Sequence, residues 1–186
     1  MITLDEHTLL LLNHLVASFY VDTDRPVTLG HNLGMVQVCA ERPFGVFYGF
    51  MPFPAIIVQA AALLEGIITF HPFADGNKRV ALLATYCFLY WNGIDLDIPV
   101  NADEFTVEIA EQKHDIATIA RWVAVNTKKS PGSILRSILL AAILVFSNRW
   151  PQLVPLIPSV FWRLWIPQYP FGFFRYKIGE QRGQTS

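Results

Sequence analysis

Hydrophobic residues in the first 125 positions recur mostly at helical spacing, so the chain is predicted to be helical. Two segments, 54–70 and 78–91, are apolar on nearly all sides, which is typical of helices at the centre of a bundle. Amphipathic spacing predicts four further helices, over residues 4–20, 33–42, 101–112 and 115–125. Asp115 is expected to cap the last of these. The predicted fold class is therefore all-α, with two central helices covered by the others.

Two short segments depart from the helical pattern. Between residues 42 and 54, aromatic residues alternate around two glycines, with prolines at both ends, which predicts a β-hairpin or flap. Residues 94–100, with the sequence IDLDIPV, favour one short strand. We therefore expect a helical bundle that carries a small hairpin and little other β-structure.

Charge divides the 186 residues into two parts and changes the picture of a single bundle. Residues 1–127 carry 6 Lys and Arg against 14 Asp and Glu, a net charge of −8. Residues 128–186 carry 8 against 1, a net charge of +7. Such asymmetry suggests parts with different partners. We predict a folded domain over residues 1–127 and a hydrophobic, basic, Pro-rich tail over residues 128–186.

The tail is rich in Trp, Phe and Pro, a composition that suits an interface or a peripheral contact with a membrane. Its longest unbroken apolar run, residues 138–146, would be about 14 Å long as a helix, against a hydrocarbon core of about 30 Å. It is therefore predicted not to span a membrane. The alternative is a tail that packs on the acidic body or is partly disordered.

Cysteine usage and the first residues point to a reducing compartment. Cys39 and Cys87 both lie among apolar, helix-forming residues and resemble small core side chains more than a disulfide framework. The chain begins with acidic residues and has no basic stretch followed by a small-residue cleavage site. A cytoplasmic location is expected, with membrane association only through residues 130–186.

A polar island, HPFADGNKR at residues 71–79, interrupts the two apolar helices. It places three donors at the N-terminus of the second helix, where free backbone N–H groups and the helix dipole suit a phosphate. Gly76 lets the backbone approach a ligand closely. The predicted phosphate-binding turn consists of Gly76, Asn77, Lys78 and Arg79. No GxxxxGK[ST] or GxGxxG phosphate loop accompanies it.

Two further residues of the island complete the chemistry of phosphate transfer. Asp75 is a single carboxylate beside the predicted phosphates, the kind of ligand that Mg2+ uses. His71 could take a proton from an attacking hydroxyl. Taken singly, His71 could instead be a C-cap, Asp75 an N-cap and Arg79 a partner of Glu65. We favour the functional interpretation, because buried charge is costly and five polar residues are more than helix caps in an apolar bundle require.

The island resembles the signature of the Fic/Doc family, H-x-F-x-[DE]-[GA]-N-[GK]-R, and the similarity extends over roughly residues 3–126. Segments RPFGVFYGFMPFP, FLYWNGIDL and IATIARWV also resemble Doc-type chains. The resemblance implies a Fic-type all-α fold with a hairpin flap, and ATP with Mg2+ as donor. It makes His71 the catalytic base, Asp75 the magnesium ligand and residues 76–79 the nucleotide-binding turn. The flap that docks the target as an added strand would contain Phe47, Tyr48, Gly49 and Phe50.

Lys78 and Leu82 favour one branch of this family. Adenylyl-transferring members usually have Gly at the position of Lys78 and Arg at the position of Leu82. Doc-type members have Lys at the first of these positions and lack the Arg at the second, as this chain does. Pro72 and Gly76 are the choices typical of the adenylyl-transferring branch. The resemblance therefore implies a Doc-like toxin that phosphorylates a hydroxyl of a protein substrate, by analogy a translation elongation factor. Alternatives are a protein adenylyltransferase and a non-catalytic binding module.

Many relatives are restrained by an inhibitory helix of the form [ST]-x-x-x-E-[GN]. No Glu in this chain has Ser or Thr four residues before it, so no such helix is encoded in the same chain. A separate antitoxin protein is therefore implied if the chain is a toxin. No nucleic-acid partner is expected.

Overall fold

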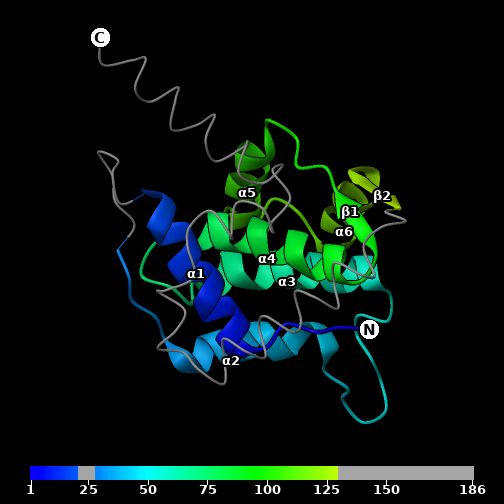
Figure 1. Cartoon of the computed structure of the whole chain (residues 1–186). Coiled ribbons are helices and arrows are strands. Elements are labelled where there is room, and N and C mark those ends of the chain that lie inside the picture. Colours follow the sequence, from blue (N-terminus) through cyan, green and yellow to red (C-terminus); the bar gives the residue numbers. More distant parts are fainter. Residues whose placement is uncertain (21–27, 130–186) are drawn as a thin grey trace.

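The computed structural model describes residues 1–20 and 28–129 and shows a helical fold (Figure 1). Its helices and strands are α1 (Glu6–Tyr20), α2 (Leu33–Glu41), the 3-10 helix η1 (Arg42–Phe44), α3 (Ile56–Phe70), α4 (Asn77–Trp91), β1 (Ile94–Leu96), α5 (Ala102–Ala110), α6 (Ile116–Val125) and β2 (Thr127–Lys129). The predicted all-α class with minor β-structure is confirmed.

Helices α3 and α4 lie side by side in the middle of the fold, with α2 below and α5 and α6 above in the view of Figure 1. Every residue from Val80 to Trp91 in α4 is buried. Nine residues of α3 are buried as well, most of them Ala, Leu or Ile. The prediction that the two apolar helices form the centre of the bundle is confirmed, since the other helices cover them on several sides.

Side-chain caps fix where several helices begin. Asp5 accepts hydrogen bonds from the backbone N–H and the hydroxyl of Thr8 at 2.8 and 2.6 Å, at the start of α1. Asn32 accepts from a backbone N–H in the first turn of α2. Asp115 accepts from the Thr118 N–H at 2.8 Å, so its predicted role as the cap of α6 is confirmed.

The hairpin predicted in the aromatic segment is present. Phe47 and Phe50 exchange two backbone hydrogen bonds of 2.8 Å each. Between them, Tyr48 has φ 51° and Gly49 has φ 78°, and positive φ at both central residues is the pattern of a type I′ turn. The side chains of the tip are exposed, and Tyr48 is the most exposed of them.

The strand expected in residues 94–100 is β1, and it pairs antiparallel with β2. Leu96 lies opposite Thr127 and Ile94 lies opposite Lys129. An ion pair of 3.1 Å between Lys128 and Asp97 supports the pairing. The sheet therefore extends two residues past the predicted domain boundary at residue 127, and that boundary stays a prediction.

Cys39 and Cys87 are free and buried, as expected for core side chains. Burial raises the pKa of each thiol to about 12. No helix within residues 1–20 and 28–129 is long and apolar enough to cross a membrane. The predictions for the tail, including its membrane contact, concern residues 130–186 and lie outside the described residues.

Candidate active site

The polar island forms the loop between α3 and α4, and two left-handed residues define its ends. His71 is the C-cap of α3, with φ 49° and ψ 57°. Gly76 is the N-cap of α4, with φ 79° and ψ 9°. Glycine adopts this conformation without strain, whereas a histidine there costs on the order of 1–3 kcal/mol. The surrounding structure must therefore hold His71 in place, which is typical of a functional position.

His71 is exposed, and its ring is oriented by the end of its own helix. Nδ1 lies 3.2 Å from the carbonyl oxygen of Thr69. When Nδ1 carries the proton and donates to this carbonyl, Nε2 is left as a proton acceptor. His71 also occupies the C-cap position of α3, and its role as the base stays a prediction.

Asp75 lies at the surface of the same loop. Its Oδ1 accepts a hydrogen bond from the Gly76 N–H at 2.6 Å, and the N-cap position itself belongs to Gly76. Within residues 1–20 and 28–129, no three His, Cys, Asp or Glu side chains gather as a metal site. A lone exposed carboxylate fits Mg2+ that arrives with phosphate oxygens and water as its other ligands.

Asn77 locks the loop from within. Its side-chain oxygen accepts from the Phe73 N–H at 2.9 Å, and its side-chain nitrogen donates to the Phe73 carbonyl at 2.8 Å. The side chain is only 8% exposed. One N–H of the amide and its oxygen are thus engaged with the loop backbone, and the predicted contact of Asn77 with a phosphate stays a prediction.

The first turn of α4 provides the remaining donors. In this turn the Val80 N–H donates to the Gly76 carbonyl at 2.9 Å, and the N–H groups of Asn77 and Lys78 precede this hydrogen bond at the start of the helix. Lys78 and Arg79 are half-buried beside them. The pKa of Glu111, at the end of α5, is lowered mainly by its hydrogen bond to Lys113, and the charge of Lys78 adds to the effect.

Glu65, the suggested partner of Arg79, contacts a different arginine. Arg42 Nη1 lies 2.6 Å from Glu65 Oε2, and both side chains are about one-quarter exposed. The oxygen is in ion-pair contact, although the geometry is not that of a hydrogen bond. Glu65 is thus engaged by η1 in the structure.

One segment beside the site carried no recognisable signal in the sequence. His31 forms an antiparallel bridge with Phe73, and two hydrogen bonds of 2.8 Å flank it, from Asn32 N–H to the Pro72 carbonyl and from Ala74 N–H to the Gly30 carbonyl. In this pattern the N–H and C=O of His31 point away from the motif loop. The sequence GHN reads only as a turn, because its partner lies about forty residues later.

The predicted flap and the motif adjoin opposite ends of α3. Figure 1 shows residues 45–54 at the N-terminal end of α3, whereas His71 lies at its C-terminal end. A helix of 15 residues is about 22 Å long, so the two ends are far apart. The island residues 71–79 are together, while Phe47, Tyr48, Gly49 and Phe50 form a separate exposed tip.

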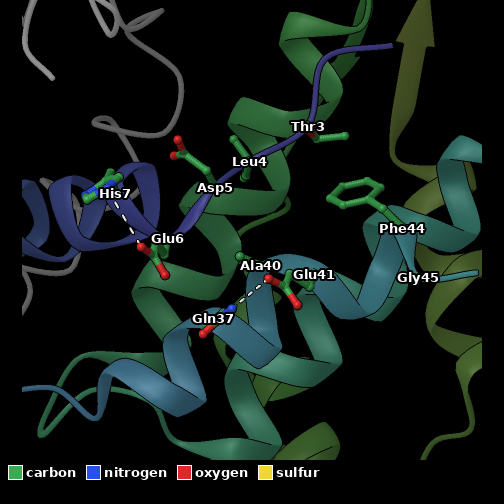
Figure 2. Close-up of a pocket in the computed structure, with 10 residues that line it drawn as sticks. All are labelled: Thr3, Leu4, Asp5, Glu6, His7, Gln37, Ala40, Glu41, Phe44 and Gly45. Atoms are coloured by element: carbon green, nitrogen blue, oxygen red, sulfur yellow. Dashed lines mark hydrogen bonds and ion pairs between the residues drawn. The ribbon is translucent and has the colours of Figure 1, made fainter. Parts of the chain in front are cut away.

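A cavity of about 600 Å3 lies between the start of α1 and the end of α2 (Figure 2). Three carboxylates, Asp5, Glu6 and Glu41, line it together with the rings of Phe44 and His7. Ile2, which precedes the residues that line the cavity, donates its backbone N–H to the side chain of Asn92 at the C-terminal end of α4. The motif lies at the N-terminal end of the same helix. None of the island residues lines this cavity, so it is separate from the candidate active site.

Comparison with known proteins decides the family. The family model described as Fic/DOC family matches residues 3–89, which include the whole island. The protein named Toxin Doc from Mycolicibacterium smegmatis (strain ATCC 700084 / mc(2)155) is 31% identical over 118 residues. That match covers 56% of this chain and 91% of the relative. The chain belongs to the Fic/Doc family. Within this family, the loop from His71 to Arg79 occupies the signature motif.

Proposed function

We propose that this chain is a Doc-like toxin that transfers the γ-phosphoryl group of ATP to a Ser or Thr hydroxyl of a target protein, by analogy a translation elongation factor. The observation that carries the proposal is the loop geometry. An oriented, exposed His71 and an exposed Asp75 stand at the N-terminus of a buried helix whose first turn carries Lys78. The similarity to a Toxin Doc supports the same conclusion.

The proposed chemistry gives each of these side chains a role. Nε2 of His71 takes the proton of the attacking hydroxyl while its oxygen forms a bond to the γ-phosphorus. The bond from that phosphorus to the bridging oxygen breaks, and ADP leaves with the electron pair. Lys78 and the N–H groups of the first turn of α4 hold the phosphates. Asp75 would hold Mg2+, which would neutralise negative charge on the phosphates.

Phosphoryl transfer is favoured over adenylyl transfer by Lys78 and Leu82. Lys78 is half-buried, and its side chain takes up space that a glycine would leave open for an α-phosphate. It also adds a positive charge that a glycine lacks. Leu82 is 2% exposed and belongs to the core, so the position of the second family arginine carries no charge for the distal phosphates. We infer that the nucleotide is held with its γ-phosphate nearest to His71.

Labelled ATP tests which group moves. Purified protein is incubated with cell extract and ATP labelled at either the α- or the γ-phosphate. We expect label in protein from the γ position alone, and a loss of about 10²- to 10⁴-fold in His71→Ala. Asp75→Ala should lower transfer and remove its dependence on magnesium. Label from the α position would instead show the adenylyltransferase of the same fold.

Expression in a bacterial host tests the toxin role separately. Induction of the full chain should arrest growth, and His71→Ala at the same expression level should not. Co-expression of each protein encoded next to this gene should identify the proposed antitoxin as the one that restores growth. Arrest that persists with His71→Ala would mean that toxicity does not arise from the proposed transfer.

The docking of the target is better explained by residues 30–32 than by the hairpin at residues 47–50. The segment lies against Phe73, and the outward N–H and C=O of His31 could pair with an added strand. A Cβ at Gly30 would lie 3.0 Å from the Ala74 Cβ, closer than such atoms normally approach. Gly30→Ala should therefore lower transfer, and Gly30→Ala with Ala74→Gly should restore it. Full transfer by Gly30→Ala alone would count against this placement.

A further inference from the structure

Arg42 lies in a box made by side chains and backbone of α3 and by Phe53, in the segment before α3. Its Nη1 contacts Glu65 at 2.6 Å and donates to the Ala62 carbonyl at 2.8 Å, both in α3. Its guanidinium carbon lies 5.2 Å from the centre of the Phe53 ring and 5.5 Å from that of Phe70. The planar cation thus contacts two aromatic rings as well as a carboxylate, a combination that suits arginine and not lysine.

Gly66 of α3 lies directly against this contact. A Cβ placed on Gly66 would lie 3.4 Å from Arg42 Nη1 and 3.9 Å from the Phe70 ring. The guanidinium and the ring therefore both lie over the bare backbone of Gly66. Because Glu65 and Arg42 are only about one-quarter exposed, the pair is screened by solvent less than a surface ion pair.

Phe70 connects this box to the candidate active site. It is the last residue of α3, and His71 follows it in the left-handed conformation. The His71 ring contacts the carbonyl of Thr69 in the same last turn. A strained backbone conformation persists only where its surroundings enforce it, and Arg42 contacts the ring of the residue immediately before the strained one.

We propose that Arg42 is a positioning residue for the transfer reaction, because it fixes Phe70 and, through Phe70, the orientation of His71. The inference rests on the proposed function, in which His71 is the base. Arg42 also contacts Phe53, at the return arm of the exposed hairpin of residues 47–50. The same box therefore ties the base of that hairpin to the end of α3 at which the chemistry takes place.

The experiment compares Arg42→Lys with Arg121→Lys, an identical change at an exposed position on α6. Lysine keeps the charge beside Glu65 but loses the planar face over Phe70. The Cε1–H resonance of His71 is followed by NMR during a pH titration, assigned by its loss in His71→Ala. Arg42→Lys should change the chemical shift and the titration midpoint of His71, and Arg121→Lys should change neither.

Transfer is measured on the same samples. Arg42→Lys should lower the rate at saturating ATP by about 10- to 100-fold with little change in the KM for ATP, since a misplaced base affects the chemical step. Unchanged His71 resonances in a folded Arg42→Lys protein would overturn the proposal. If the wild-type protein transfers no phosphate, the proposed function has failed, and the NMR result alone decides the positioning role.

Phe70→Leu is a second variant that tests the proposal if Arg42→Lys does not fold. It leaves the contacts of Arg42 with Glu65 and Ala62 in place and removes only the aromatic face through which Arg42 is inferred to act. Phe70→Leu should alter the His71 resonance in the same direction as Arg42→Lys. A wild-type His71 resonance in folded Phe70→Leu would show that the ring does not transmit the position of Arg42.

Discussion

Replacing Asn77 by Ala should unfold the motif loop locally and destabilise the whole domain. The wild-type side chain makes two hydrogen bonds, of 2.9 and 2.8 Å, to the backbone of Phe73, and Phe73 is only 3% exposed. Removing the amide leaves a buried N–H and a buried carbonyl without these partners, at about 1–3 kcal/mol for each group. Partial relaxation of the loop makes a total loss of about 2–4 kcal/mol the expected result.

Urea unfolding followed by circular dichroism measures this loss. A change of about 2–4 kcal/mol is a large share of the roughly 5–15 kcal/mol that stabilises a typical domain, and it corresponds to a fall in Tm of about 10 °C. The slope of the transition with urea should stay constant, because the surface exposed on unfolding is nearly the same.

Asn77→Asp provides the matched control. The carboxylate can still accept from the Phe73 N–H, but it places a negative oxygen against the Phe73 carbonyl. This raises the pKa of the new carboxyl in the folded state, so its destabilising effect should be greatest at neutral pH and should diminish as the pH falls and the acid becomes a donor. An Asn77→Ala protein within about 0.5 kcal/mol of wild type would refute the loop-locking role. Normal stability with lost transfer would instead identify the side chain as a phosphate ligand.

Three further changes test other parts of the structure. Gly66→Ala, whose Cβ would lie 3.4 Å from Arg42, should raise the unfolding free energy by about 0.5–1 kcal/mol through helix propensity, and a lower Tm would show that the space is needed. Hydrogen bonds from the first turn of α6 lower the pKa of Asp115, so its contribution is present above the unfolded pKa of 3.8 and is lost as the pH falls through the folded pKa. The Tm difference between wild type and Asp115→Ala should therefore shrink below about pH 4, and a constant difference would contradict this linkage. Cys39 and Cys87, with pKa values raised to about 12 by burial, should react with a thiol reagent at pH 8 only after unfolding.

Most helices and the motif could be predicted from the sequence because their signals are local. The apolar runs that become α3 and α4 are visible without any knowledge of their neighbours, and so is the cap at Asp115. The island stands out for the same reason, since polar residues inside an apolar run are costly unless they have a role. The fold class followed from these local patterns and is confirmed by the structure.

The pairing of segments distant in sequence could not be predicted in this way. The partner of β1 is a strand of three residues, Thr127–Lys129, that begins at the predicted end of the domain. The motif loop pairs with His31, which lies about forty residues earlier in the chain. Short pairs of this kind are selected by the packing of the helices around them, and no periodicity marks them.

The same distinction explains why the hairpin at residues 47–50 suggested a docking flap. Its turn chemistry correctly predicts a hairpin, but a local pattern carries no information about which end of α3 the hairpin lies beside. The structure places it beside the end of α3 away from His71, and Arg42 contacts both Phe53, which follows the hairpin, and Phe70, at the other end of α3. The motif supplies the reacting groups, and residues outside it determine how those groups are held.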